Sequence, residues 1–271
     1  MTVTRLSTVV LAVSVGAGLI AGCDAGGGPS AVATPPSASP ATSAPAPSGP
    51  VTSSAAPAGG TDAAGTRAVG AGCAPDGTGL PAGAVSGPTV DVDGDGRADS
   101  AWLQRNADGT QLAGITTASG ATFGAPYSSA SPLPRRVLVA KVDGAGTVAA
   151  IVSDGRQAGL FIVVKCSLVP AKNPQGAQYT FDLGFGDGGT GIGCSRVAGT
   201  SGTGLVGLKL NRDGAGKPVS VTRTAIRLDG PSASNGVSDT VDVSGDPTGP
   251  AATTATQITC GDLTMKADGV G

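Results

Sequence analysis

Histidine and glutamate are both missing from this chain of 271 residues, so all 19 acidic side chains are aspartates. The absence of histidine excludes mechanisms that use a histidine general base and metal sites built on imidazole. The absence of glutamate excludes the usual glutamic acid of glycosidases and the terminal ligand of an EF-hand. The formal net charge of −2 provides no basic footprint, and we therefore expect no nucleic-acid partner.

Residues 1–22 have the pattern of an export signal. Arg5 precedes an apolar or small run, residues 6–22, that is too short and too rich in glycine and alanine for a good membrane-spanning helix. Residues 19–23 read Leu-Ile-Ala-Gly-Cys, which resembles a bacterial lipobox. The resemblance implies cleavage before Cys23 and acylation of Cys23 with palmitate-like chains, which anchor a protein stably in a membrane. An ordinary secretory signal and a simple N-terminal anchor are the alternatives.

The composition and the signal together predict a location. Alanine, glycine, threonine and valine are abundant and lysine is scarce, which resembles proteins of GC-rich actinobacteria. We expect an actinobacterial-type lipoprotein on the extracytoplasmic face of the cell membrane.

Residues 23–72 form an alanine-, proline-, serine- and glycine-rich segment. Residues 24–72 contain eight prolines, three charges and no aromatic residue. Such a segment cannot bury enough apolar surface to offset the entropy lost on ordering, so we predict a disordered tether. As a coil it would extend roughly 40 Å, enough to space a domain from the membrane. A wall-binding or O-glycosylated stalk is the alternative.

Residues 73–271 are the folded part, because all seven aromatic residues lie there. Their number suits one domain with a sizeable core. Short β-branched runs at 136–140, 160–165 and 205–210 predict strands, and 219–228 shows the apolar–polar alternation of half-buried strand. Turn-forming clusters separate these runs, and no amphipathic helix longer than two turns is evident. The predicted fold class is all-β.

Four cysteines remain once Cys23 is assigned to lipid. An even number in an exported domain predicts two disulfides, with three connectivities open. We favour Cys166–Cys194, which brackets a glycine-rich stretch, and Cys73–Cys260, which would clamp the two ends of the domain. A four-cysteine zinc site is disfavoured, because no two of these cysteines have C-x₂-C spacing.

The most specific motif is the nonapeptide at 91–99, Asp-Val-Asp-Gly-Asp-Gly-Arg-Ala-Asp. Calcium takes several oxygen ligands, commonly from alternate positions of a curled loop. The carboxylates of Asp91, Asp93 and Asp95 stand at positions 1, 3 and 5. The main-chain carbonyl of Arg97 and the carboxylate of Asp99 follow at positions 7 and 9. Four carboxylates this close repel one another unless a cation neutralises them, so we predict one calcium site. A solvated acidic turn is the alternative.

The nonapeptide, with strand-like segments on both sides, resembles the calcium loop of FG-GAP/VCBS-type repeats, known from the integrin α-chain propeller. Residues 140–152, 195–207 and, more weakly, 241–246 align with residues 90–102 at spacings of about 50, which is typical of a propeller or array. Only the first copy keeps its acidic positions, so the calcium ligands are assigned there alone. The resemblance implies a small or incomplete β-propeller-like domain.

These features favour a non-enzymatic binding or envelope-associated module. FG-GAP-like domains are mostly interaction platforms, and the chain lacks the residue types of common catalysis. The expected partners are the membrane, through the lipid anchor, and an unidentified envelope polysaccharide or protein, and we expect a monomer. A hydrolase that uses aspartate or calcium and a purely structural envelope protein are the alternatives.

Overall fold

The computed structural model describes residues 72–184 and 189–265, which hold fifteen strands and one short helix. All of these residues belong to a single compact unit, residues 62–271. The predicted signal peptide, Cys23 and the tether up to residue 71 lie outside the described residues. Because this unit contains every described strand and both disulfides, it holds the core that it needs to fold by itself.

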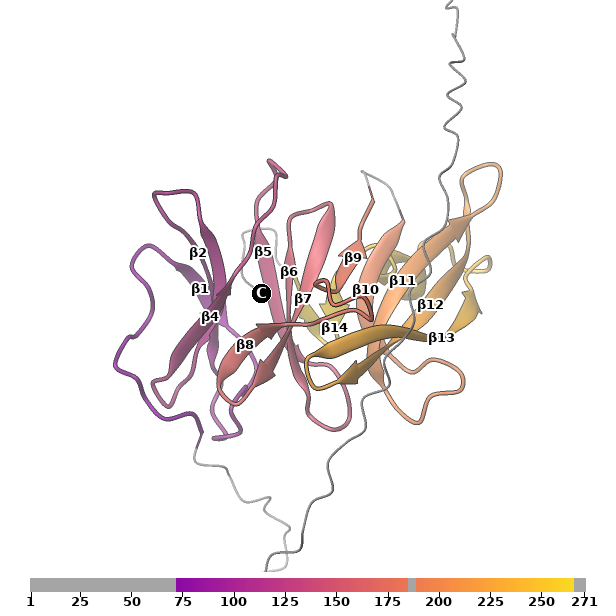
Figure 1. Cartoon of the computed structure of the whole chain (residues 1–271). Helices are drawn as coiled ribbons and strands as arrows, with labels where there is room; N and C mark the ends of the chain where they lie inside the picture. Colours follow the sequence, from indigo (N-terminus) through magenta and orange to yellow (C-terminus); the bar gives the residue numbers. More distant parts are fainter. Residues whose placement is uncertain (1–71, 185–188, 266–271) are drawn as a thin grey trace, which may run out of the picture. The chain divides into compact units, whose positions relative to one another are not determined.

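Three successive antiparallel meanders make up most of the fold (Figure 1). Sheet A contains β1 (Val85–Pro88), β2 (Ser100–Arg105), β3 (Gln111–Thr116) and β4 (Thr122–Pro126), paired in sequence order. Sheet B contains β5 (Arg136–Lys141), β6 (Val148–Ser153), β7 (Gln157–Val164) and β8 (Ser167–Pro170), and β9 (Thr180–Asp182) also pairs with β7. Sheet C contains β10 (Thr190–Ser195), β11 (Gly204–Arg212), β12 (Pro218–Asp229) and β13 (Ser232–Asp242).

Two short elements follow sheet C. Helix α1 (Pro250–Thr254) is one turn long, and β14 (Thr259–Cys260) and β15 (Leu263–Thr264) form a two-stranded sheet D. No helix in the described ranges is long and apolar enough to cross a membrane. The prediction of an all-β fold is confirmed, and no sheet closes on itself within the described part of the chain.

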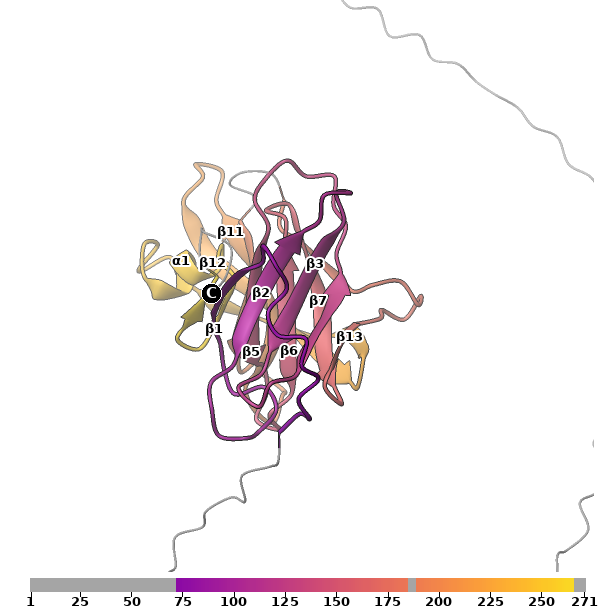
Figure 2. The same cartoon turned by 90° about the vertical axis from the view of Figure 1, so that its left-hand side faces the viewer.

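Sheets A, B and C lie side by side in sequence order, and Figure 2 views the row from the side of sheet A. Sheet B lies in the middle, and both of its faces are buried. In β5, Val137 and Val139 join the core shared with sheet A, whereas Leu138 and Ala140 join the core shared with sheet C. This explains why residues 137–140 are a continuous apolar run, since a strand that is buried on both faces has no polar side to present.

Sheet C buries two different faces, which explains the pattern at residues 219–228. Leu205 and Ile226 pack into the core between sheets B and C. Leu210 and Val221 are cross-strand partners on the opposite face, where they pack against Ala252 of α1. The apolar residues of β12 therefore change from odd to even positions along the strand, because each end faces a different core.

The disulfides join Cys73 to Cys166 and Cys194 to Cys260. The predicted pairs, Cys166–Cys194 and Cys73–Cys260, are therefore wrong. Cys166 and Cys194 are close in the sequence, but they belong to different sheets. Cys166 lies in the tight β7–β8 turn of sheet B, and Cys194 lies on β10 of sheet C. Ile192 and Ile258 form a parallel bridge, so the two chain segments run alongside each other and Cys194 meets Cys260 two residues further on.

Candidate metal site

The acidic nonapeptide lies in the loop between β1 and β2, at residues 89–99. Main-chain hydrogen bonds close the base of this loop: Thr89 donates to the carbonyl of Asp99 at 2.8 Å, and Asp99 donates to the carbonyl of Val90 at 3.4 Å. Gly94 and Gly96 have φ angles of +79° and +84°. Glycine adopts this left-handed region without a steric penalty, which lets the loop curl tightly.

The curled loop brings three carboxylates together. Asp91, Asp93 and Asp99 each direct one carboxylate oxygen into a group whose members lie within 4.8 Å of one another. Asp91 and Asp93 are half-buried, whereas Asp99 is 3% exposed. Three aspartate oxygens at this separation provide a hard-oxygen environment that suits a divalent cation such as calcium.

Asp99 occupies the most enclosed position of the acidic cluster, which we define as Asp91, Asp93 and Asp99. Its Oδ2 accepts a hydrogen bond from the main-chain N–H of Val92 at 2.7 Å, and its Oδ1 accepts one from Ala118 at 2.8 Å. Burial, which is the largest influence, and the neighbouring charges of Asp93 and Asp95 raise the pKa of Asp99, although the two N–H donors oppose this. A bound cation would favour the ionised carboxylate and offset this cost.

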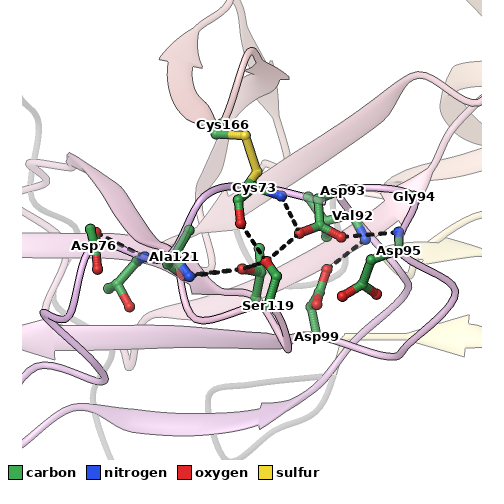
Figure 3. Close-up of a disulfide and its surroundings, with 12 residues drawn as sticks. Cys73, Asp76, Val92, Asp93, Gly94, Asp95, Asp99, Ser119, Ala121 and Cys166 are labelled. Atoms are coloured by element: carbon green, nitrogen blue, oxygen red, sulfur yellow. Dashed lines mark hydrogen bonds between the residues drawn. A yellow bond between two sulfur atoms is a disulfide. The ribbon is translucent and has the colours of Figure 1, made fainter. Parts of the chain in front are cut away.

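Asp93 connects the acidic cluster to the first disulfide (Figure 3). Its Oδ2 accepts the main-chain N–H of Cys73 at 2.8 Å and the hydroxyl of Ser119 at 2.8 Å. The Ser119 hydroxyl also lies 2.7 Å from the carbonyl of Cys73. Burial is the largest influence on the Asp93 carboxyl and opposes its ionisation, but these donors together outweigh it and hold the pKa below its ordinary value. Asp93 is therefore held in place as a charged group.

Asp95 and Arg97 pair with each other. The Arg97 guanidinium donates to Asp95 Oδ2 from Nε at 3.0 Å and from Nη2 at 2.8 Å, and the Arg97 main-chain N–H donates to Oδ1 at 2.8 Å. The oxygens that lie within 4.8 Å of one another belong to Asp91, Asp93 and Asp99. The carboxylate of Asp95 was also predicted as a ligand, but the loop does not bring it into this group. A second cation lies close by, because Lys141 Nζ is 3.9 Å from Asp91 Oδ2.

The loops that align with the nonapeptide occupy equivalent places in the next two sheets. Residues 142–147 connect β5 to β6, and residues 196–203 connect β10 to β11, which are again the first two strands of a meander. Asp143 uses one oxygen to accept the main-chain N–H groups of Ala145 and Thr147 in its own turn. The fourth alignment, 241–246, is wrong, because this segment continues from the last strand of sheet C toward α1.

Sequence reasoning missed Cys73 and Ser119 as parts of this site. They lie 20 and 26 residues from Asp93 in the chain, and neither belongs to a recognisable motif. Only the folding of sheet A brings them to the loop.

Comparison of the chain with protein-family models, with curated proteins and with solved structures finds no match.

Proposed function

We propose that the chain is an extracytoplasmic lipoprotein, anchored through Cys23, whose folded domain is a calcium-stabilised, non-enzymatic binding or envelope module. The observation that carries this proposal is the convergence of Asp91, Asp93 and Asp99 within 4.8 Å. The two disulfides add support, because structural disulfides persist in oxidising compartments outside the cytoplasm.

Calcium suits the acidic cluster better than the other common protein metals. Zinc favours sulfur and nitrogen ligands, and the cluster offers only oxygen. Magnesium binds through few carboxylates and keeps most of its water. Calcium accepts irregular sets of carboxylates and main-chain carbonyls, and extracellular sites bind it at about 10⁻⁴ to 10⁻³ M. Bound there, calcium would supply positive charge and fix the β1–β2 loop against the N-terminal end of the folded unit.

The arrangement of the sheets favours a relationship to FG-GAP-like repeats. Each of sheets A, B and C contains a meander of four sequential strands, to which sheet B adds β9, and the aligned loop lies between the first two strands of each meander. Successive sheets also pack face to face through shared cores. We interpret them as three blade-like units of an incomplete propeller-like domain, in which only the first loop retains a calcium site.

The proposed role is display of this monomeric domain on a tether, where it binds an envelope polysaccharide or protein. Calcium has a structural part in this role: it stabilises sheet A and takes part in no reaction. A thermodynamic consequence follows, because a ligand that binds only the folded state raises its stability by mass action.

Titration calorimetry of residues 62–271 with calcium chloride tests the metal site. We expect one site with a dissociation constant near 10⁻⁴ M and weaker binding of magnesium. Asp91→Asn removes one charge of the acidic cluster and should weaken binding by at least tenfold. Asp143→Asn alters the equivalent loop of sheet B and should leave binding unchanged. Absence of heat with both metals, together with an unchanged Tm in calcium and in EDTA, would exclude the calcium site.

Metabolic labelling with radioactive palmitate, in a bacterial host that processes lipoproteins, tests the anchor. The full chain should incorporate label and sediment with membranes, and Cys23→Ser should do neither. A labelled Cys23→Ser variant, or an unlabelled wild-type chain, would contradict acylation at this cysteine.

A further inference from the structure

A pocket lies at the end of sheet A that is opposite to the acidic cluster. Its volume is about 610 Å³, which is within the range of small-molecule sites. The start of β1, the end of β2 and the start of β3 form one wall, and residues 129–135, which lead into β5, form the other. The acidic loop lies at the other end of these strands, between the end of β1 and the start of β2. None of its residues lines the pocket.

The pocket collects apolar side chains that the fold leaves in water. Four large hydrophobic residues are exposed in the described part of the chain, and two of them, Val85 at 57% and Leu133 at 43%, line this pocket. Half-buried Leu103 and Leu112 also line it. Clustered exposed apolar surface of this kind is typical of a binding site, because a ligand that covers it gains the hydrophobic free energy.

The charged lining of the pocket is entirely positive. Arg105 and Arg135 line it, and no aspartate does. The guanidinium of Arg135 donates to the side chain of Gln111 and to the carbonyls of Ser129, Ser131 and Leu133. All of these acceptors are neutral, but the buried carboxylate of Asp154, which lies outside the pocket lining, is close enough to offset part of the Arg135 charge. Arg105 is exposed and has no ion-pair partner among the described residues.

The same hydrogen bonds make the outer wall rigid. Hydrogen bonds from Arg135 to the carbonyls of Ser129 and Ser131 hold the loop at residues 129–135 together, and the bond to Gln111 attaches this loop to β3. Pro132 and Pro134 further limit the conformations of this loop. A pocket that is fixed before the ligand arrives loses less conformational entropy on binding, which favours a small ligand.

We propose that this pocket binds a small amphiphilic carboxylate, with its apolar body against Val85 and Leu133 and its carboxylate toward Arg105 and Arg135. The exposed guanidinium of Arg105 is well suited to a carboxylate, because its parallel N–H groups match the two oxygens. Arg135 contributes mainly positive charge, since four of its five N–H groups already donate to protein oxygens. The apolar walls select against small inorganic anions, and the net positive charge of the lining, above all the unpaired Arg105, selects against neutral amphiphiles.

Titration of ¹⁵N-labelled residues 62–271 by NMR tests this inference, with octanoate as the probe and 1-octanol as the neutral probe of equal chain length. We expect chemical-shift changes at residues 103–105 and 129–135, and octanoate should bind about threefold to tenfold more tightly than octanol. Equal affinity for the two probes would overturn the assignment of an anionic ligand. Shifts centred elsewhere would overturn the pocket itself.

Two pairs of variants separate the charge contribution from the apolar one. Arg105→Gln should weaken octanoate about threefold to tenfold and leave octanol unchanged, whereas Arg196→Gln, at an exposed arginine outside the pocket, should change neither. Leu133→Ser should weaken both probes about tenfold, and Val237→Ser, at an exposed valine on β13, should weaken neither. An effect of the controls equal to that of the pocket variants would overturn the proposal.

Discussion

The main-chain N–H of Cys73 donates to Oδ2 of Asp93 at 2.8 Å, which links the first disulfide directly to the acidic cluster. Cys73 is also the first strongly buried residue after the segment that precedes the described structure, at 3% exposure. The entry of the chain into the folded domain is thus held by a covalent bond to Cys166 and by a charge-assisted hydrogen bond to Asp93. The position of Asp93 therefore depends on the disulfide.

Removal of the Cys73–Cys166 bridge should weaken calcium binding. In the variant Cys73→Ser/Cys166→Ser the N-terminal end is free to leave the loop, and we expect the calcium affinity to fall about fivefold, the equivalent of one ordinary hydrogen bond. The matched control is Cys194→Ser/Cys260→Ser. Each bridge closes a long loop, of 93 and 66 residues, and by the chain-entropy model each contributes about 4–5 kcal/mol to stability.

Calorimetric titration of both double variants distinguishes the local effect from general destabilisation. Equal affinities in the two would show that the disulfide does not position Asp93. Where loss of the bridge unfolds the domain, Ser119→Ala tests the related claim that hydrogen bonds to Asp93 support calcium binding, because it removes the hydroxyl that donates to Asp93 and leaves both disulfides intact.

Arg97→Gln should strengthen calcium binding. The Arg97 guanidinium holds Asp95 through two hydrogen bonds and places a positive charge beside the acidic cluster. Its removal frees a fourth carboxylate, and we expect an affinity gain of about threefold to tenfold at low salt. Arg196→Gln is the control for a general change in charge. Weaker binding by Arg97→Gln would show that Arg97 supports the loop and does not compete for Asp95.

Gly114→Ala should destabilise sheet A severely. Trp102 and Gly114 are cross-strand partners, and a Cβ atom at Gly114 would overlap Cζ2 of the Trp102 ring. The ring also lies against Gly124, the partner of Gly114 on β4. We expect a loss of about 3 kcal/mol in the free energy of unfolding, measured by urea denaturation. Gly144→Ala, with open space around its Cβ position, should change stability by less than about 1 kcal/mol.

Asp154 should control part of the acid stability. Burial is the largest influence on its carboxyl and opposes ionisation, but hydrogen bonds from Ser129, Gln157 and Arg156 and the nearby charge of Arg135 together lower the pKa below its ordinary value. A lowered folded-state pKa contributes stability above the unfolded value of 3.8, and this contribution is lost as the pH falls through the folded value.

The Asp154→Asn variant should therefore be less stable than wild type at pH 7, by about 1–3 kcal/mol, and the difference should shrink below about pH 4. Urea denaturation across this pH range measures it. Asp229→Asn, at an exposed aspartate, serves as the control and should change little. A difference that stays constant down to pH 2 would show that the charge of Asp154 does not stabilise the fold.

Local sequence patterns predict the strands well and the long-range contacts poorly. The runs at 136–140 and 205–210 coincide with β5 and β11, because short runs rich in apolar and β-branched residues mark strands that the core buries. The disulfide partners of Cys73 and Cys194 depend on which sheets are neighbours, and no local pattern encodes this. Spacing likewise placed Asp95 among the ligands, whereas its side chain pairs with Arg97, a competition between neighbours that position alone does not reveal.

The pocket at sheet A shows the same limit. Arg105 and Arg135 are ordinary surface residues in the sequence, and nothing in their spacing marks a site. They meet because β2 and the loop before β5 lie at the same end of sheet A. Clusters formed by residues from separate elements emerge only with the tertiary fold.

Thermal denaturation of oxidised residues 62–271, in millimolar calcium and in excess EDTA, tests most directly whether the acidic cluster is a calcium site. With a dissociation constant near 10⁻⁴ M, calcium should add about 1.5 kcal/mol of stability and raise Tm by about 3–6 °C. Asp91→Asn should reduce this rise to about a third or less, and Asp143→Asn should retain it. The same Tm with calcium and with EDTA, or an unchanged rise in Asp91→Asn, would contradict a calcium site at Asp91, Asp93 and Asp99.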